Sequence, residues 1–404
     1  MSPFLLFVIL VLFQTADLST VSDISRISES HIEETTTYFN ITDFRFEGAQ
    51  ALTSAIEDAH YVALGELHNR IQLGELTQTL LNHLKPHGYN HFAIETGPYS
   101  ARKLEQLIQT GKPSVSEFYD EYSSGLFDFV PIPFFTGESD LNFLVAADSL
   151  GYELWGLDQE FYYSFSYLTD ELAFINKSRL TTEQKKLLDQ VSSKLYWWKR
   201  RAKIFSGFDM SCRLQEYEPL SAYLESFEDI ENEPTNQILK AIDATLEIYC
   251  LAEQNKASSR VRIRYFKENF NAYYREASDE HQEPKVFMKI GSFHAGRQQS
   301  PLGIFDIGNH IHQLADTLSQ KSVHIRYLNR FYKGDDMLEE KGWESSSSFI
   351  SVGRQDEWAL VDLRPLRKRI EEGTLQGTEF EKREIINYDF IIIPPEDDVV
   401  KKHF

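Results

Sequence analysis

The sequence contains very few cysteines and few basic residues. Only Cys212 and Cys250 occur among 404 residues, which excludes a disulfide framework and any four-thiolate zinc site. In an exported protein these two cysteines can pair and join two helical segments, although the sequence alone leaves this open. Lys and Arg number 41 against 62 Asp and Glu, so the formal net charge is -21. That charge argues against nucleic acids and anionic membranes as partners, because both are bound through clustered basic side chains.

A long hydrophobic run is missing from the N-terminal region. The apolar run at residues 3–13 is shorter than the about 20 residues that a membrane-spanning helix needs. It is typical of the apolar core of a secretory signal peptide, and Ala16 offers a small residue for cleavage nearby. We therefore expect a signal peptide over residues 1–19 and a secreted or periplasmic, extracytoplasmic protein. No stable membrane insertion is expected after the signal is removed.

Several well-known catalytic and binding motifs are also absent. The chain has no Gly-x-Ser-x-Gly elbow, which argues against a serine-nucleophile hydrolase of that kind. No phosphate loop and no dinucleotide fingerprint occur. Gly65 is followed directly by Glu66, whose carboxylate would repel a phosphate group. The partner that we expect is a small-molecule substrate.

What the sequence does contain is the pattern of a large α/β domain. Hydrophobic residues make up 42%, with 29 Phe and 20 Tyr, which is enough for a sizeable core. Seven short runs are rich in apolar residues, and most of them are apolar at consecutive positions, as in strands that are covered on both faces. The predicted strands are residues 61–64, 92–94, 153–157, 286–290, 323–328, 358–363 and 390–393.

Helical patterns lie between these strands, so the alternation predicts a doubly wound, mostly parallel sheet with helices on both faces. Residues 160–280, approximately, have helical spacing nearly throughout and are predicted to form a helical insertion. Residues 20–50 are polar and are expected to form an irregular N-terminal arm. The α/β domain with its insertion is then expected over residues 51–404.

Ionisable side chains follow four of the predicted strands. Glu66 and His68 come after the first strand, Glu95 after the second, Asp158 after the third and His294 after the fourth. Because the carboxyl ends of parallel strands share one edge of a sheet, we expect these side chains to meet there. Histidine can act as a general base or acid near neutral pH, and a neighbouring carboxylate fixes its tautomer and raises its basicity. The set therefore predicts an acid–base site.

The segments around these residues resemble the successive motifs of erythromycin-esterase-like proteins. The matching segments are residues 65–68, 88–89, 93–95, 156–158, 262–269, 289–297 and 388–393. Their order and spacing cover about residues 60–320, and the last segment is similar to the final strand of that family. The short Gly-Glu-x-His form of the first motif also resembles haem-binding lipoproteins and distant metal-dependent proteases of the same superfamily.

The resemblance implies a hydrolase in which His68 activates water. Glu66 and Glu95 would orient this histidine or the substrate, and His294 would be the second catalytic imidazole. Arg262 would pair with a carboxylate or stabilise an oxyanion. The residues expected on the substrate side of the site are Asp158, Arg262 and Arg297. The esterases commonly have Thr before the first histidine, where this chain has Leu67, so macrolide hydrolysis does not follow from the resemblance.

Three functions remain open at this point. The first is a hydrolase without a cofactor, in which a histidine-activated water attacks an ester or related bond of an unknown small molecule. The second is a metal-dependent hydrolase that uses the mixed nitrogen and oxygen ligands of the site for zinc, manganese or iron. The third is a non-catalytic protein that binds haem or another small ligand, since Tyr and His are possible haem ligands. We expect the first and predict no cofactor.

Overall fold

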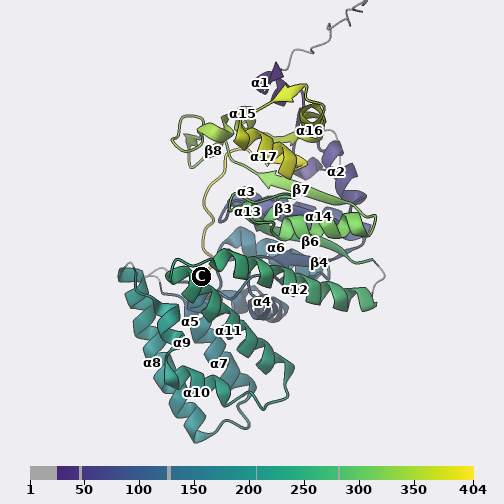
Figure 1. Cartoon of the computed structure of the whole chain (residues 1–404). Coiled ribbons are helices and arrows are strands. Elements are labelled where there is room, and N and C mark those ends of the chain that lie inside the picture. Colours follow the sequence, from purple (N-terminus) through teal and green to yellow (C-terminus); the bar gives the residue numbers. More distant parts are fainter. Residues whose placement is uncertain (1–24, 45–47, 125–128, 206, 281–282) are drawn as a thin grey trace, which may run out of the picture.

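A central mixed sheet organises the protein (Figure 1). The computed structural model describes residues 25–44, 48–124, 129–205, 207–280 and 283–404. Within these residues, eight strands form the sheet in the order β2-β10-β12-β7-β3-β6-β4-β5. In that order they span Thr36–Phe39, Trp358–Asp362, Phe390–Ile393, Ser322–Tyr327, Tyr61–Glu66, Lys285–Gly291, Tyr89–Ile94 and Glu153–Gly156. Two small pairs lie outside it: β1 (Ser25–Arg26) with β11 (Leu375–Gln376), and β8 (Phe331–Tyr332) with β9 (Asp335–Asp336). The predicted signal peptide, residues 1–19, lies outside the described residues.

Six neighbouring strands of the sheet, from β12 to β5, run parallel to one another. Among the described residues of this sheet, only β10 pairs antiparallel with its neighbours, β12 and β2. Each of the seven predicted strands is present. Their apolar side chains are buried because helices cover both faces of the sheet. The prediction of an α/β fold with a mostly parallel sheet is confirmed.

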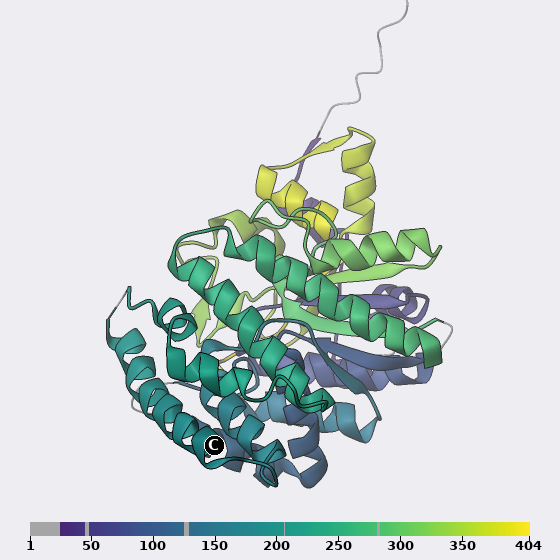
Figure 2. The same cartoon turned by 60° about the horizontal axis from the view of Figure 1, so that its bottom comes forward.

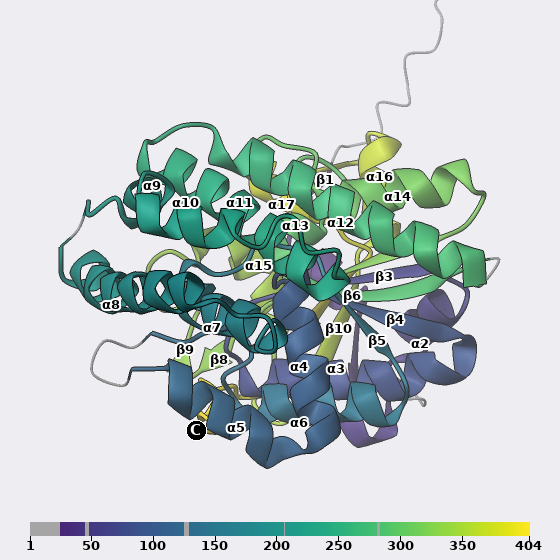
Figure 3. The same ribbon diagram turned by 90° about the horizontal axis from the view of Figure 1, so that it is seen from below.

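The helices pack on both faces of the sheet, as Figure 3 shows from below. Val62 and Leu64 of β3 point into one apolar cluster with α2, α3 and α6, whereas Tyr61 and Ala63 point into another with α12, α14 and α17. The helices before the insertion are α1 (Glu29–Glu33), α2 (Gln50–Glu57), α3 (Ile71–Leu84), α4 (Pro98–Thr110), α5 (Lys112–Tyr122) and α6 (Glu138–Ser149). Those after it are α13 (Ser292–Ala295), α14 (Ile307–Thr317), α15 (Ser347–Ile350), α16 (Arg364–Glu371) and α17 (Glu379–Asn387).

Strand β2 lies within residues 20–50, for which we expected an irregular, polar N-terminal arm. Its residues Thr36–Phe39 pair with β10, so that Tyr38 lies opposite Ala359. The strand is short and only Phe39 is fully buried, because an edge strand has one neighbour and needs few apolar residues. The pairing partner, rather than the local composition, makes this segment a strand.

The residues between β5 and β6 form a layer of helices at one side of the sheet (Figures 1 and 2). They are α7 (Phe165–Ile175), α8 (Thr182–Ile204), α9 (Met210–Gln215), α10 (Glu218–Glu225), α11 (Glu233–Glu253) and α12 (Ser258–Glu280). Phe266 and Phe270 of α12 are buried in the apolar cluster on the sheet, so α12 joins the helical layer to the strands. None of the described helices combines the length and the apolar character that a membrane span requires.

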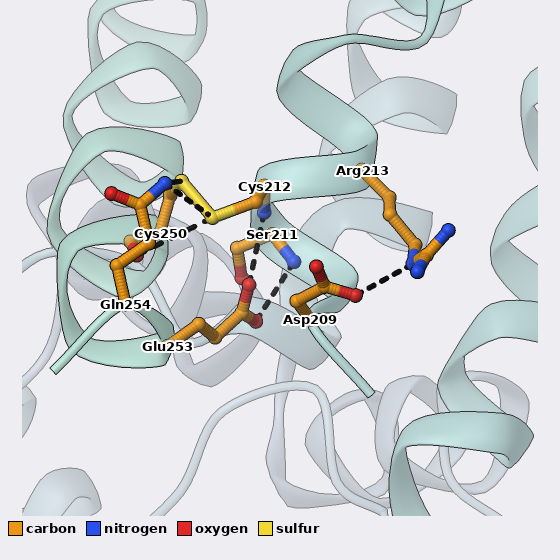
Figure 4. Close-up of a disulfide and its surroundings, with 7 residues drawn as sticks. All are labelled: Asp209, Ser211, Cys212, Arg213, Cys250, Glu253 and Gln254. Atoms are coloured by element: carbon orange, nitrogen blue, oxygen red, sulfur yellow. Dashed lines mark hydrogen bonds and ion pairs between the residues drawn. A yellow bond between two sulfur atoms is a disulfide. The ribbon is translucent and has the colours of Figure 1, made fainter. Parts of the chain in front are cut away.

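A disulfide between Cys212 and Cys250 joins α9 to α11 (Figure 4), with the two Cα atoms 4.6 Å apart. Next to it, the Glu253 carboxylate accepts hydrogen bonds from the backbone N–H groups of Ser211 and Cys212, at 2.8 and 2.9 Å. These bonds satisfy donors at the start of α9 that the helix itself cannot satisfy. The pairing that the sequence left open is therefore present, and it anchors a short helix of the insertion.

Candidate active site

The carboxyl ends of β3, β4, β5 and β6 meet at one edge of the sheet, as parallel strands must. Six of the seven predicted site residues come together there. We call the following set, which adds two further side chains, the active-site cluster: Glu66, His68, Glu95, Asp158, Arg262, Lys289, His294 and Asp306. Glycine makes this convergence possible, since a Cβ atom at Gly291 would lie 2.9 Å from Glu95 Oε2 and 3.2 Å from His68 Nε2.

His68 lies between two carboxylates. Its Nδ1 is 3.3 Å from Glu66 Oε1 and its Nε2 is 3.9 Å from Glu95 Oε2. Burial by itself lowers the pKa of His68, but the charges of Glu66 and Glu95 outweigh it and raise the pKa above the usual value. The ring of Phe134 stacks on the imidazole at 3.7 Å between centroids, and it limits the directions from which His68 can be approached.

Glu66 is kept ionised by a lysine within the sheet. Lys289 Nζ donates a hydrogen bond to Glu66 Oε2 at 2.5 Å, and both side chains are 2% exposed. Burial opposes ionisation of Glu66, yet the charges of Lys289 and His68 together lower its pKa to about 2. Glu66 therefore faces His68 as a permanent negative charge at any pH near neutrality.

Glu95 is the centre of the cluster. Its Oε2 accepts the backbone N–H of Gly291 at 2.5 Å, and its Oε1 accepts Arg262 Nη2 at 2.8 Å. Burial works against the charged form, but His294, His68 and Arg262 together lower the pKa of Glu95. A buried carboxylate held in this way has a defined orientation and remains negative.

His294, like His68, has a carboxylate next to Nδ1, and here the contact is a hydrogen bond. Its Nδ1 donates to Asp306 Oδ2 at 2.8 Å, and its Nε2 points to Glu95 Oε1 at 3.7 Å. Asp306 is itself held by the backbone N–H of Ile307, at 2.7 Å, as the N-cap of α14. Burial lowers the pKa of His294, but the hydrogen bond to Asp306 and the charge of Glu95 raise it overall. Both imidazoles thus have a carboxylate behind Nδ1 and direct Nε2 at Glu95.

Arg262 on α12 connects the helical layer to the cluster. Its Nε and Nη2 donate to the two oxygens of Asp158, at 2.9 and 2.6 Å, in a two-pronged ion pair. Burial raises the pKa of Asp158, and the charge of Glu95 adds to this against the opposing effect of Arg262. Since Arg262 also contacts Glu95, one guanidinium orients two carboxylates of the site.

A cavity of about 310 Å³ opens beside Glu95, Asp158 and Arg262. Its size lies at the lower end of the range typical of small-ligand pockets. The wall opposite the sheet comes from the helical layer, with Ile248 and Tyr249 of α11. The insertion thus forms part of the pocket that adjoins the charged residues.

The structure places Arg297 outside the cluster. Its guanidinium pairs with Asp389, directly before β12, and Asp389 also pairs with Arg367 and accepts the backbone N–H of His324. Arg297 thus joins α13 to the strands β12 and β7. A position close to His294 in the sequence does not place a side chain in the site, because the chain turns away after α13.

Sequence reasoning did not select Lys289, Asp306 or Phe134. Lys289 had a usable signal: a lone lysine within the apolar run Val286–Ile290 requires a buried acidic partner. Asp306 comes directly before α14, where an aspartate is indistinguishable from an ordinary helix cap. Phe134 comes from a loop, so no periodicity marks it; its φ of 67° is uncommon for a residue with a side chain.

Ligand atoms of Glu66, His68 and Glu95 lie within 4.8 Å of one another, which is close enough to hold a metal ion. However, Lys289 already neutralises Glu66, and Arg262 and a backbone N–H already occupy the two oxygens of Glu95. A divalent cation would have to compete with two side-chain cations at contact distance. These residues do not fit a resident metal, and a haem iron facing either imidazole would meet the same carboxylate, Glu95. We therefore derive no step through either group.

Comparison with known proteins supports the fold. No protein-family model and no curated protein sequence matches the chain. Among solved structures, a succinoglycan biosynthesis protein aligns over 92% of this chain and 97% of its own, with a TM-score of 0.55 and 16% identity. A Bacillus cereus protein aligns over 93% and 98%, with a TM-score of 0.54 and 14% identity. A mutant of the erythromycin esterase EreC, in its open conformation, aligns over 90% and 98%, with a TM-score of 0.52 and 14% identity. At these identities the likeness concerns the fold, and at that level the resemblance to erythromycin-esterase-like proteins is confirmed.

Proposed function

We propose that the protein is a hydrolase in which His68 removes a proton from a water molecule that attacks an ester or related bond of a small molecule. The observation that carries this proposal is the pair of imidazoles around Glu95. Each has a carboxylate behind Nδ1, and each presents Nε2 to the same centre next to a cavity of ligand size. The fold shared with an erythromycin esterase is consistent with this reaction class.

In the proposed reaction, neutral His68 takes the proton on Nε2 as the water oxygen bonds to the acyl carbon. Glu66 and Glu95 stabilise the imidazolium that forms, since both are ionised. The carbonyl oxygen gains negative charge in the tetrahedral intermediate, and the guanidinium of Arg262 at the cavity provides the nearest positive charge. Protonated His294 then gives its proton to the leaving oxygen as the bond to the acyl carbon breaks. The two histidines exchange protons with solvent before the next turnover.

A screen of small esters and lactones with the purified chain, beside His68→Ala, tests this proposal. General-base catalysis contributes typically about 10²–10⁴-fold, so His68→Ala should lower kcat by that factor with a much smaller change in KM. His31→Ala is the matched control, because His31 lies on α1 and contacts Ser28. Turnover that survives in His68→Ala would refute the role of this residue. Saturable ligand binding without turnover in the native chain would instead support the non-catalytic alternative.

We also propose that the protein works outside the cytosol. The apolar run at residues 3–13 and the disulfide between Cys212 and Cys250 both support export, since disulfides persist in oxidising compartments. Expression in a secreting host should yield a chain shortened near residue 19, as N-terminal sequencing would show. A cell-retained chain that keeps Met1 would contradict export.

A further inference from the structure

A second group of histidine and carboxylate ligands lies at the opposite edge of the sheet. Glu57 is the last residue of α2, His83 is in the last turn of α3, and His87 follows in the 3₁₀ turn η2 (Lys85–His87). We call these three residues the Glu57 cluster. The segments lead into β3 and β4, so the cluster is at the amino ends of the strands whose carboxyl ends carry the active-site cluster.

The side chains of the Glu57 cluster converge on one point. His83 Nε2 lies 3.1 Å and His87 Nε2 lies 3.7 Å from Glu57 Oε1, and the ligand atoms of all three residues are within 4.8 Å of one another. Zinc bonds to nitrogen and oxygen are about 2.0–2.2 Å, so two ligands in a tetrahedron are about 3.3–3.6 Å apart. The two distances to Glu57 Oε1 bracket this value.

We propose that Glu57, His83 and His87 bind a Zn²⁺ ion, with water as the fourth ligand. Two imidazoles and one carboxylate form a ligand set that suits zinc, because nitrogen ligands favour it over Mg²⁺ and Ca²⁺. His83 lies in the last turn of α3 and His87 in the 3₁₀ turn η2 that follows directly, and the Nε2 atoms of both rings face the same oxygen of Glu57. The carboxylate comes from a separate element, so the ion joins α2 to the end of α3.

The electrostatic surroundings of the Glu57 cluster favour a cation. α2 ends at Glu57 and α3 ends at Leu84, so the partially negative C-terminal ends of two helices lie at the site. No lysine or arginine among the described residues pairs with the Glu57 carboxylate; Lys285 donates instead to the backbone carbonyl of Glu57, at 3.4 Å. This is the decisive difference from the active-site cluster, where side-chain cations already occupy the carboxylates.

The ion also has a path to the site. His83 is nearly buried, with a 5% exposed side chain, whereas those of His87 and Glu57 are 35% and 40% exposed. Ligands that protrude to this extent leave room for water on the open side. Since the ion would bind the native chain and tie two elements together, it would raise the stability of the fold rather than take part in the reaction at the other edge.

Calorimetric titration of the chelator-treated full chain with Zn²⁺ tests this site. One equivalent should bind, and His87→Ala or Glu57→Gln should each weaken binding by more than about tenfold, the loss that even an outer-shell change produces. These two side chains are partly exposed, so both variants should fold, which melting curves would verify. Replacement of zinc by Co²⁺ gives a second readout, since its absorption spectrum reports the coordination geometry.

Two controls locate the ion. His60→Ala removes a neighbouring histidine whose Nε2 lies 3.4 Å from Glu283, and it should leave zinc affinity unchanged. His68→Ala should also leave it unchanged, because His68 belongs to the active-site cluster. Retention of full affinity in both His87→Ala and Glu57→Gln would overturn the proposal, and so would an absence of zinc binding in the native chain. Loss of binding in His68→Ala alone would move the metal to the active-site cluster and contradict the proposed site.

Discussion

The two edges of the sheet carry similar residues but differ in one respect. At the carboxyl edge, His68 and His294 stand next to Glu66, Glu95 and Asp306. The side chains of Lys289 and Arg262 are already bound to Glu66 and Glu95 there. At the amino edge, His83 and His87 stand next to Glu57, with which no lysine or arginine of the described chain pairs.

This difference decides which chemistry each cluster favours. Where the protein provides fixed cations, the carboxylates remain charged without a metal, and the imidazoles are left to exchange protons. Where no lysine or arginine of the described residues pairs with the carboxylate, a metal ion can balance its charge. The identity of the ligands is therefore a poor guide by itself, and their existing partners are more informative.

Among the changes that test this difference between the two edges, Lys289→Met should have the largest effect, a loss of unfolding free energy. The change leaves Glu66 buried without its cation, and removal of one partner of a buried ion pair typically costs about 3–5 kcal/mol. Chemical denaturation of the variant and the native chain measures the loss of unfolding free energy. The double variant Lys289→Met/Glu66→Gln should recover most of it. If the double variant is as unstable as the single one, Lys289 stabilises the fold through its cation–π contacts with Phe135 and Phe143 and not through its ion pair with Glu66.

Asp306→Asn tests whether the second imidazole depends on its carboxylate. The amide keeps the size of the side chain but loses the negative charge. That charge orients the imidazole of His294 and raises its pKa. We expect a fall in kcat of about 10²–10³-fold, within the range that general acid–base catalysis contributes. Steady-state kinetics on an ester substrate measures it, with Asp316→Asn at the end of α14 as the control. Equal kinetics in Asp306→Asn and Asp316→Asn would contradict a role of His294 in the reaction.

Zinc should stabilise the chain through the amino edge alone. Free Zn²⁺ at about 100 times its Kd should add about 2.7 kcal/mol to the free energy of unfolding. Thermal melting with and without zinc should show the shift in the native chain and in His68→Ala, and show none in His87→Ala. An equal shift in all three proteins would mean that zinc binds elsewhere.

The smallest effect expected is on the pH dependence of hydrolysis. A general base must be deprotonated, so activity should rise with pH through the raised pKa of His68, about tenfold per pH unit at the acid end. If His294 is the acid, activity should fall again as pH rises through its own raised pKa. Glu66→Gln removes a large cause of the shift in His68, so the rising limb should move to lower pH, while Glu29→Gln on α1 should not move it. If the rising limb of the pH profile does not move in Glu66→Gln, a group other than His68 causes it.

Much of the fold could be predicted from local sequence. The seven apolar runs became strands because backbone groups inside a core must pair in a ladder, and a run of that length has few alternatives. β2 escaped prediction, since the four residues Thr36–Phe39 form a strand only because β10 offers an unpaired edge. Local composition describes central strands better than edge strands for this reason.

The candidate site could be predicted in part. The positions of Glu66, Glu95, Asp158 and His294 after successive strands followed from the shared edge of a parallel sheet. Arg297, which was selected from the resemblance, does not join the cluster, because the direction of a side chain after α13 depends on the turn that the chain takes toward Asp389. The reasoning from the shared edge did not single out the Glu57 cluster, whose residues lie at the other edge and approach only when α2 packs beside α3.

By itself, the sequence determined seven of the eight strands described in the central sheet, and it showed that acids and histidines follow four of them. It did so because apolar periodicity and strand direction are local properties. Only the tertiary structure decided which cation stands against which carboxylate: Lys289 reaches Glu66 from the adjacent strand, and Arg262 reaches Asp158 from the helical layer. Electrostatic energy depends on separations of a few ångströms between segments far apart in the chain, and those separations exist only once the sheet and its helices have packed.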